Sequence, residues 1–68
     1  QIELPILSPR LREARRAVVA AFEQKFVVET LRATGGNVSQ AARRAGIRRQ
    51  SFQRLMKRYG LSSREFKS

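Results

Sequence analysis

The chain has 68 residues and a formal net charge of +10, with fifteen Lys or Arg, five acidic residues, no Cys and no His. A chain of this length forms one small domain that buries only about 60% of its unfolded surface and is marginally stable alone. The absence of Cys excludes disulfides and thiolate metal sites, and the absence of His removes the commonest metal ligand and general base. We therefore expect no cofactor and no enzymatic activity, and oligomerisation is the remaining usual source of stability.

The positive charge is concentrated in the second half of the chain. No acidic residue lies between Glu29 and Glu65, whereas Arg and Lys are frequent there. A segment with this much uncompensated positive charge is expected to face either a polyanion or solvent. No segment approaches the ~20 apolar residues that cross a bilayer, and the N-terminus lacks the pattern of a secretory signal. The expected location is therefore the cytoplasm, on the nucleoid if the polyanion is DNA, without a membrane partner.

The first residues of the chain have the character of a linker. Residues 1–8 contain Pro5 and no helical period, which is typical of a linker end. Because the chain begins with Gln rather than Met, we expect a piece of a longer protein, cut at that linker. Ser8 and Pro9 then give a helix-start signal, since Ser can cap a helix and Pro is tolerated at its first position.

Residues 10–34 contain neither Gly nor Pro and predict one long helix, or two helices with a bend at residues 22–24. The apolar residues of this segment form a stripe wider than one small helix pair covers. We expect this surplus to make a homodimer; the alternative is that the helix only packs on residues 37–59. The residues expected at the dimer interface are Leu11, Val18, Phe22 and Phe26.

Two short helices are expected next, over residues 38–45 and 49–59. Asn37 is a good N-cap for the first, and Gln40 completes a capping-box pattern with it. Gly46 is expected to take the left-handed turn between the helices, because it has no Cβ to clash. The segment therefore predicts two helices joined by a tight turn.

The small and apolar residues around that turn have the spacing of a helix-turn-helix. Ala42 supplies the small residue where the two helices cross. The residues expected to face inward are Ala41, Ala45, Ile47, Phe52 and Leu55, with Met56 and Tyr59 as further core. The opposite face of the second helix is basic, so the spacing separates an apolar inside from a cationic outside. With the long first helix, this predicts an all-α fold.

The basic face predicts a helix that enters the major groove of double-stranded DNA, which is about 12 Å wide and admits one α-helix. In such units the first residues of the second helix meet the base edges. The residues expected there are Arg48, Arg49, Gln50, Ser51 and Gln53. Phosphate contacts are expected from Arg54, Lys57 and Arg58, and from Asn37 and Ser39 at the start of the first short helix. Alternatively, Asn37 is only a cap, and Lys57 and Arg58 only offset the helix dipole.

The stretches LREARRAVVAAFEQKFVVETL and GGNVSQAARRAGIRRQSFQRLMKRYGL resemble the Fis-type helix-turn-helix found at the C-terminus of bacterial sigma-54-dependent activators of the NtrC type. The resemblance spans residues 11–61 and implies four helices, the first two making a homodimer and the last two reading palindromic DNA. It also implies an ATPase domain upstream in the full-length protein. Two residues depart from the pattern: Arg48 stands where a capping Ser, Asp or Asn is common, and Thr30 where Leu is usual.

The resemblance implies that the residues in contact with DNA are Arg48, Arg49, Ser51, Gln53, Arg54, Lys57 and Arg58. It also implies contacts with the DNA backbone at Asn37 and Ser39. The expected organisation is a linker end at 1–8, a DNA-binding domain at 9–61 with dimerisation over 9–34 and the helix-turn-helix over 37–59, and a tail at 62–68. The predicted function is that of a sequence-specific DNA-binding domain of a sigma-54-dependent activator. The alternatives are a Fis-like architectural protein of the nucleoid, a protein-interaction module, and a basic helix lying on a membrane.

Overall fold

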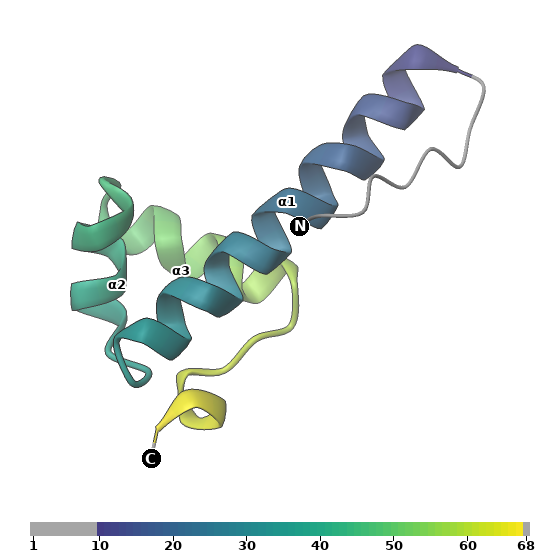
Figure 1. The fold of residues 1–68 in the computed structure, drawn as a ribbon. Helices are drawn as coiled ribbons and strands as arrows, with labels where there is room; N and C mark the ends of the chain where they lie inside the picture. The colour runs from purple at the N-terminus through teal and green to yellow at the C-terminus, as the bar shows by residue number, and fades with distance from the viewer. Residues whose placement is uncertain (1–9, 68) are drawn as a thin grey trace.

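The computed structural model describes residues 10–67, which form three α-helices and a terminal 3-10 helix (Figure 1). The helices are α1 (Leu11–Ala33), α2 (Val38–Ala45), α3 (Arg49–Arg58) and η1 (Ser63–Phe66). No strand occurs within residues 10–67, so the expected all-α fold is confirmed. The linker expected at 1–8 and the helix start expected at Ser8 and Pro9 lie outside the described residues.

The first helix is continuous. It runs for 23 residues from Leu11 to Ala33, so the alternative of two helices with a bend at residues 22–24 is wrong. Residues 10–67 therefore hold three α-helices rather than the four that the resemblance implies. Its N-cap is Arg10, whose side chain makes no capping hydrogen bond. The C-terminal half of α1 packs against α2 and α3, whereas its N-terminal half projects beyond them (Figure 1). The molecule thus has a folded body and a protruding helix arm.

The core lies where the three α-helices meet. Its buried residues are Val27 and Leu31 of α1, Ala41 and Ala42 of α2, and Phe52 and Met56 of α3. The methyl side chains of Ala41 and Ala42 let α2 approach both neighbours closely. Val38, Ala45, Leu55, Leu61 and Phe66 are partly buried around this centre. Burial of the inner face therefore follows the predicted helix-turn-helix spacing, with one exception.

The exception is Ile47, which was expected to face inward and is 38% exposed. Ile47 lies in the turn, beyond the last residue of α2 and before the first of α3, so neither helix directs its side chain into the core. Its backbone N–H still donates to the carbonyl of Ala42, at 3.0 Å. Gly46 has the left-handed conformation predicted for it, with φ 75°. The turn is therefore as expected, but its apolar residue faces outward.

The N-cap of α2 is confirmed, although the full capping box is not. The Asn37 side-chain oxygen accepts from the backbone N–H of Gln40 at 3.0 Å. The reciprocal partner of the Asn37 N–H is the carbonyl of Thr34, at 3.2 Å, rather than the Gln40 side chain. The Asn37 side chain thus gives a hydrogen-bond partner to one of the backbone N–H groups that have none within the first turn of α2.

Thr30, which stands where the family usually has Leu, is a buried polar residue on α1 with 7% of its surface exposed. Its hydroxyl donates to the carbonyl of Phe26 at 2.7 Å. This bond removes the cost of burying an unpaired hydroxyl. The departure from the family pattern is therefore accommodated within the helix.

The C-terminal segment, residues 62–67, was expected only as part of a tail and is ordered against the rest of the fold. Ser62 and Glu65 form a reciprocal capping box at the start of η1. Phe66 packs against the core, and η1 contacts α1. A Cβ placed on Gly36 would lie 2.5 Å from the carbonyl oxygen of Ser63. The segment therefore rests directly on the loop between α1 and α2.

This close approach makes a testable distinction between two adjacent glycines. Both Gly35 and Gly36 have positive φ, but only a Cβ on Gly36 would meet another atom within 4 Å. Gly35→Ala should cost about 1–2 kcal/mol of unfolding free energy from left-handed strain alone, and Gly36→Ala should cost more. Urea unfolding measures both losses, and backbone amide NMR shifts report on residues 62–67. Equal losses, with no shift change in that segment for Gly36→Ala, would contradict the packing described.

Candidate nucleic-acid interface

The exposed side of α3 carries a continuous set of polar and cationic side chains. Gln50, Gln53, Arg54 and Lys57 line a shallow groove of about 330 Å³ along this helix. All of them are exposed, whereas Phe52 on the opposite side is fully buried. Because positions three and four apart share one helix face, these side chains project together. The structure thus brings together four of the predicted DNA-contacting residues on one helix surface.

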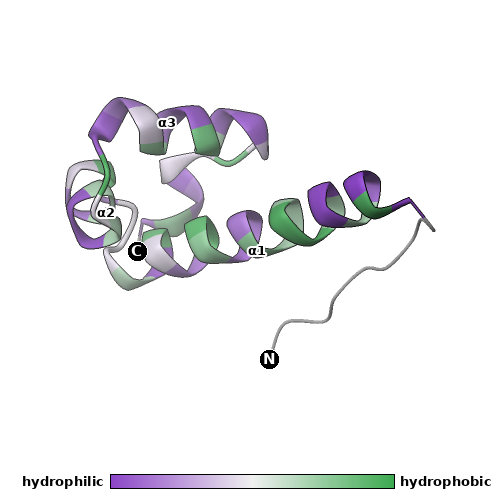
Figure 2. Ribbon diagram, turned by 90° about the horizontal axis from the view of Figure 1, so that it is seen from above, coloured by the Kyte–Doolittle hydropathy of each residue, from purple (hydrophilic) through white to green (hydrophobic). Residues whose placement is uncertain are grey.

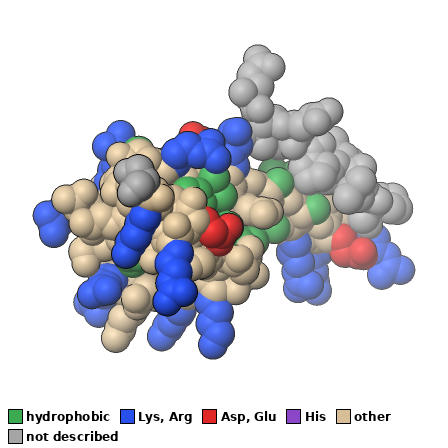
Figure 3. Space-filling model, turned by 90° about the horizontal axis from the view of Figure 1, so that it is seen from below, with side chains coloured by type: hydrophobic (Ala, Val, Ile, Leu, Met, Phe, Trp, Pro, Cys, Tyr) green, Lys and Arg blue, Asp and Glu red, His purple; other side chains and the backbone are tan. Residues whose placement is uncertain are grey.

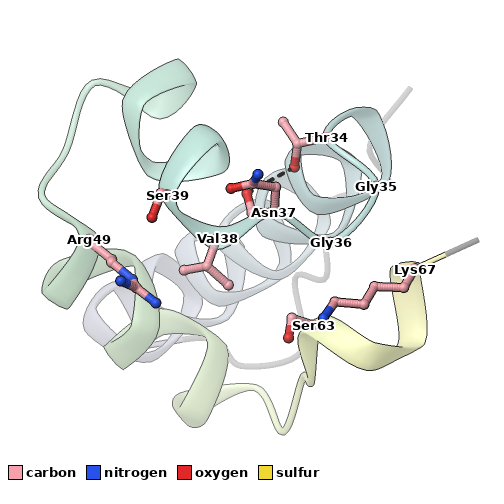
Figure 4. A pocket seen from close by; sticks show the side chains of 9 residues that line it. All are labelled: Thr34, Gly35, Gly36, Asn37, Val38, Ser39, Arg49, Ser63 and Lys67. Atoms are coloured by element: carbon pink, nitrogen blue, oxygen red, sulfur yellow. Dashed lines mark hydrogen bonds between the residues drawn. The ribbon is translucent and has the colours of Figure 1, made fainter.

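A second hollow, of about 530 Å³, joins the start of α3 to the start of α2 (Figure 4). Three predicted contact residues line it: Arg49, the first residue of α3, together with Asn37 and Ser39. Figure 4 shows the Arg49 side chain extending from α3 toward Val38. Asn37 is both the cap of α2 and a lining residue, so the two roles considered for it are compatible.

The remaining predicted contact residues lie elsewhere. Arg48 is the exposed N-cap of α3 and makes no capping hydrogen bond, so its guanidinium is not used to start the helix. Ser51 is half-buried. Arg58 faces α1, where its Nη1 lies 3.5 Å from Oε1 of Glu23. Arg58 is therefore set apart from the groove that Gln50, Gln53, Arg54 and Lys57 line.

The contact of Arg58 with α1 belongs to a network that the sequence did not predict. The Tyr59 hydroxyl donates to the same Glu23 oxygen at 2.6 Å. This hydrogen bond raises the pKa of Tyr59 above its ordinary value of 10.0, with partial burial and the Glu23 charge adding to it and Arg58 opposing it. The bonded residues are 36 positions apart, so no local spacing signals the pair. The network ties the end of α3 to the middle of α1.

The surface around both hollows is cationic. Neither α2 nor α3 contains an acidic residue. In Figure 3, Lys and Arg side chains project from much of the rim of the visible face and outnumber the acidic side chains seen on it. Of the Glu side chains on α1, Glu29 pairs with Arg32 at 3.4 Å and Glu23 pairs with Arg58. The helix-turn-helix therefore presents a positive potential that favours a polyanion.

Other classes of site find little support in the described part of the chain. Residues 10–67 hold no group of three or more His, Cys, Asp or Glu placed to bind a metal ion. Among the same residues, no helix combines the length and the apolar character that crossing a membrane requires. Every buried side-chain nitrogen or oxygen there has a hydrogen-bond partner, so the described core has no unpaired polar atom that a ligand would satisfy.

The two crossed helices, the glycine turn and the exposed cationic face define a DNA-binding protein of the helix-turn-helix class. The sequence model of bacterial regulatory proteins of the Fis family matches residues 18–59, more than half of the chain. The chain belongs to this family, which confirms the resemblance seen in the sequence. No significant match was found among curated proteins or among solved structures. The match ends at Tyr59, before the C-terminal segment 62–67.

Proposed function

We propose that this chain is the sequence-specific DNA-binding domain of a bacterial transcription activator, with α3 as the helix that enters the major groove. The exposed side chains of Gln50, Gln53, Arg54 and Lys57 on one face of α3 are the observation that carries this proposal. Amide and guanidinium groups are the side chains that pair bidentately with adenine and guanine. The apolar opposite face anchors α3, so the reading face can approach DNA without unfolding the core.

The proposed roles divide along the helix. Arg49 and Gln53 are the main base readers, followed by Arg48, Gln50 and Arg54, with Ser51 beside them at the helix start. Lys57 and Arg58 are assigned to phosphate, with Asn37 and Ser39 gripping the backbone from α2. Because Glu23 already pairs with Arg58, we expect Arg58 to contribute less to DNA affinity than Lys57 does. Phosphate contacts position the helix, and base contacts give specificity.

The reading role of Arg49 has a direct test. Arg49→Ala should weaken binding to the selected site by about 1–3 kcal/mol, because a bidentate contact to guanine is lost. Binding to unrelated duplex should weaken much less, so the ratio of the two affinities falls. Arg12→Ala, an exposed Arg on the projecting part of α1, removes the same charge and serves as the control. Fluorescence anisotropy at fixed salt measures both; an unchanged affinity ratio for Arg49→Ala would rule out its reading role.

We further propose that the chain binds palindromic sites as a homodimer formed through α1. Large apolar side chains stand exposed on this helix, with Leu11 67%, Val19 52%, Phe22 50% and Phe26 41% accessible. The rings of Phe22 and Phe26 stack with their centroids 5.9 Å apart. Figure 2 shows hydrophobic positions continuing along the part of α1 that no other helix covers. Val18, the other residue predicted at this interface, is half-buried.

The exposed apolar face of α1 is separate from the face that packs in the core. Phe22 precedes the buried Val27 by five positions, which places the two side chains about 140° apart around an α-helix. Val27 and Leu31 can therefore hold α2 and α3 while Phe22 and Phe26 contact a second copy. Exposed apolar surface of this kind on a small domain marks an interaction site.

Introducing a charge on this face tests the dimer. Phe22→Glu should give monomers with weak affinity for a palindromic site, because a carboxylate would be buried in an apolar interface. Gln24→Glu adds the same charge at an exposed position of the same helix and should remain dimeric. Sedimentation velocity reports the mass of each variant. A dimeric Phe22→Glu protein with unchanged site affinity would overturn the proposed interface.

The wider context is proposed from the sequence resemblance. Residues 9–61 are taken as the DNA-binding domain, with dimerisation over 9–34, the helix-turn-helix over 37–59, a linker end at 1–8 and a tail at 62–68. The domain would follow a sigma-54-directed ATPase domain in the full-length protein and act in the cytoplasm, on the nucleoid. Its role there is to concentrate the activator near its promoter.

A Fis-like architectural protein is the second candidate, favoured by the exposed cations outside α3. Arg12, Arg15 and Arg16 on α1 and Arg43 and Arg44 on α2 are all exposed and suit phosphate contacts without regard to sequence. The ratio of affinities for a palindromic site and for random duplex, at one salt concentration, separates the two functions. A protein-interaction module remains as a third reading, and complete absence of DNA binding at low salt would favour it.

A further inference from the structure

We infer that the C-terminal segment, residues 62–67, is part of the DNA interface, and that Lys67 holds a backbone phosphate in the hollow that Arg49 also lines. This inference rests on the proposed DNA-binding function. The segment lies beyond the residues that match the Fis family, so the family pattern assigns it no role. From the sequence alone this segment is expected only as part of a tail, although Ser62 and Glu65 have the spacing of a capping box.

The segment holds Lys67 in a defined place. The backbone N–H of Ser62 donates to Oε2 of Glu65 at 2.7 Å, and the hydroxyl of Ser62 accepts from the N–H of Arg64 at 3.3 Å. Phe66 packs against the core on one side of Lys67. On the other side, a Cβ built on Gly36 would lie 3.0 Å from Cγ of Lys67, so the lysine stem lies against the loop between α1 and α2. The side chain therefore starts from an ordered backbone rather than a free end.

The hollow beside Lys67 has the electrostatics of an anion site. Its lining residues are Thr34, Gly35, Gly36, Asn37, Val38, Ser39, Arg49, Ser63 and Lys67. Arg49 and Lys67 contribute positive charge from two different elements, and no acidic residue lines the hollow. The one Glu of the segment, Glu65, is turned into the cap of η1. Ser39 and Ser63 add hydroxyl donors, so the lining pairs two cations with neutral hydrogen-bonding groups.

The side chains lie on opposite sides of this space. Figure 4 shows Arg49 reaching in from α3, whereas the Lys67 side chain runs back along η1 with its ammonium beside Ser63. A phosphate held by Lys67 would also lie in the positive field of Arg49, and charge-assisted hydrogen bonds to phosphate are stronger than neutral ones. Lys binds phosphate as a point charge and needs no fixed approach angle, which suits an exposed lysine just after a short helix.

The position of the hollow favours DNA over a small free anion. Arg49 lines it and is also the first residue of α3, so the hollow adjoins the surface proposed to face the bases. When α3 lies in the major groove, the strand that borders the groove passes its N-terminal end. Lys67 would thus extend the phosphate contacts of α2 by one, from an element outside the helix-turn-helix. Such a contact raises affinity for all sequences equally and carries no base preference.

The test measures DNA affinity against salt for the 68-residue chain and two matched variants. Lys67→Gln should weaken binding several-fold to cognate and random duplex alike, and make the slope of log K against log salt less steep by about 0.9. Arg64→Gln removes one charge from the 3-10 helix that precedes Lys67, at an exposed residue that does not line the hollow, and should leave the slope unchanged within error. Circular dichroism melting of each variant checks that the fold is retained.

The possible outcomes separate the inference from the proposed function. If Lys67→Gln and Arg64→Gln change the slope equally, the effect is one of net charge, and the Lys67 contact is overturned while DNA binding stands. If the unmodified chain binds no duplex at low salt, the proposed DNA-binding function is wrong, and the Lys67 contact that rests on it is overturned as well. Amide NMR titration with inorganic phosphate gives the last comparison: saturable, Lys67-dependent shifts around residues 36–39 without any DNA affinity would assign the hollow to a free anion instead.

Discussion

Phe52 lies fully buried in the core cluster that α3 shares with Val27 and Leu31 of α1 and the alanines of α2, and this packing determines which side of α3 faces solvent. Burying each such side chain contributes about 1.5–3 kcal/mol, a large share of the stability of so small a domain. Because α3 is held by this one apolar side, its opposite side must face solvent. The cations and amides of α3 are exposed as a consequence, and the alanines of α2 make the close crossing possible.

The same packing gives α1 two roles. Its C-terminal half supplies Val27 and Leu31 to the core, while its N-terminal half extends past the body with apolar side chains uncovered (Figure 2). Glu23 stands between these halves and bonds the Tyr59 hydroxyl at the end of α3. Exposed ion pairs such as that of Glu23 with Arg58 add little stability by themselves. The hydrogen bond adds a second connection between α1 and the end of α3, outside the core, and two copies joined through α1 would need the two helices held at a defined angle.

Much of the fold follows from local signals in the sequence, since each element carries its own. The glycine at position 46, the cap at Asn37 and the spacing of Phe52 and Met56 predict α2, the turn and α3 to within a residue or two. Ile47 was placed wrongly because residues in a turn follow neither helical period. The continuity of α1 was left open because helix propensity alone does not distinguish one continuous helix from two helices joined by a bend.

The candidate site was only partly predictable. Helical periodicity placed Gln50, Gln53, Arg54 and Lys57 on one face, and the structure brings them together. It could not place Arg58 against Glu23, nor Lys67 and Ser63 around the same hollow as Arg49, because these arrangements join segments distant in sequence. A capping-box pattern at Ser62 and Glu65 was the one local signal that residues 62–67 are structured. Tertiary proximity of this kind becomes visible only once the helices are assembled.

The central claim is that α3 reads DNA and that two copies do so together through α1. Selection of binding sites from a random duplex library by the 68-residue chain tests both parts at once. The account predicts enriched sites that are palindromic, with half-site centres about 10–10.5 base pairs apart or a multiple of that, as successive major grooves on one face of DNA require. A selected pool with no enriched sequence, or with single half-sites and no second copy, would contradict it.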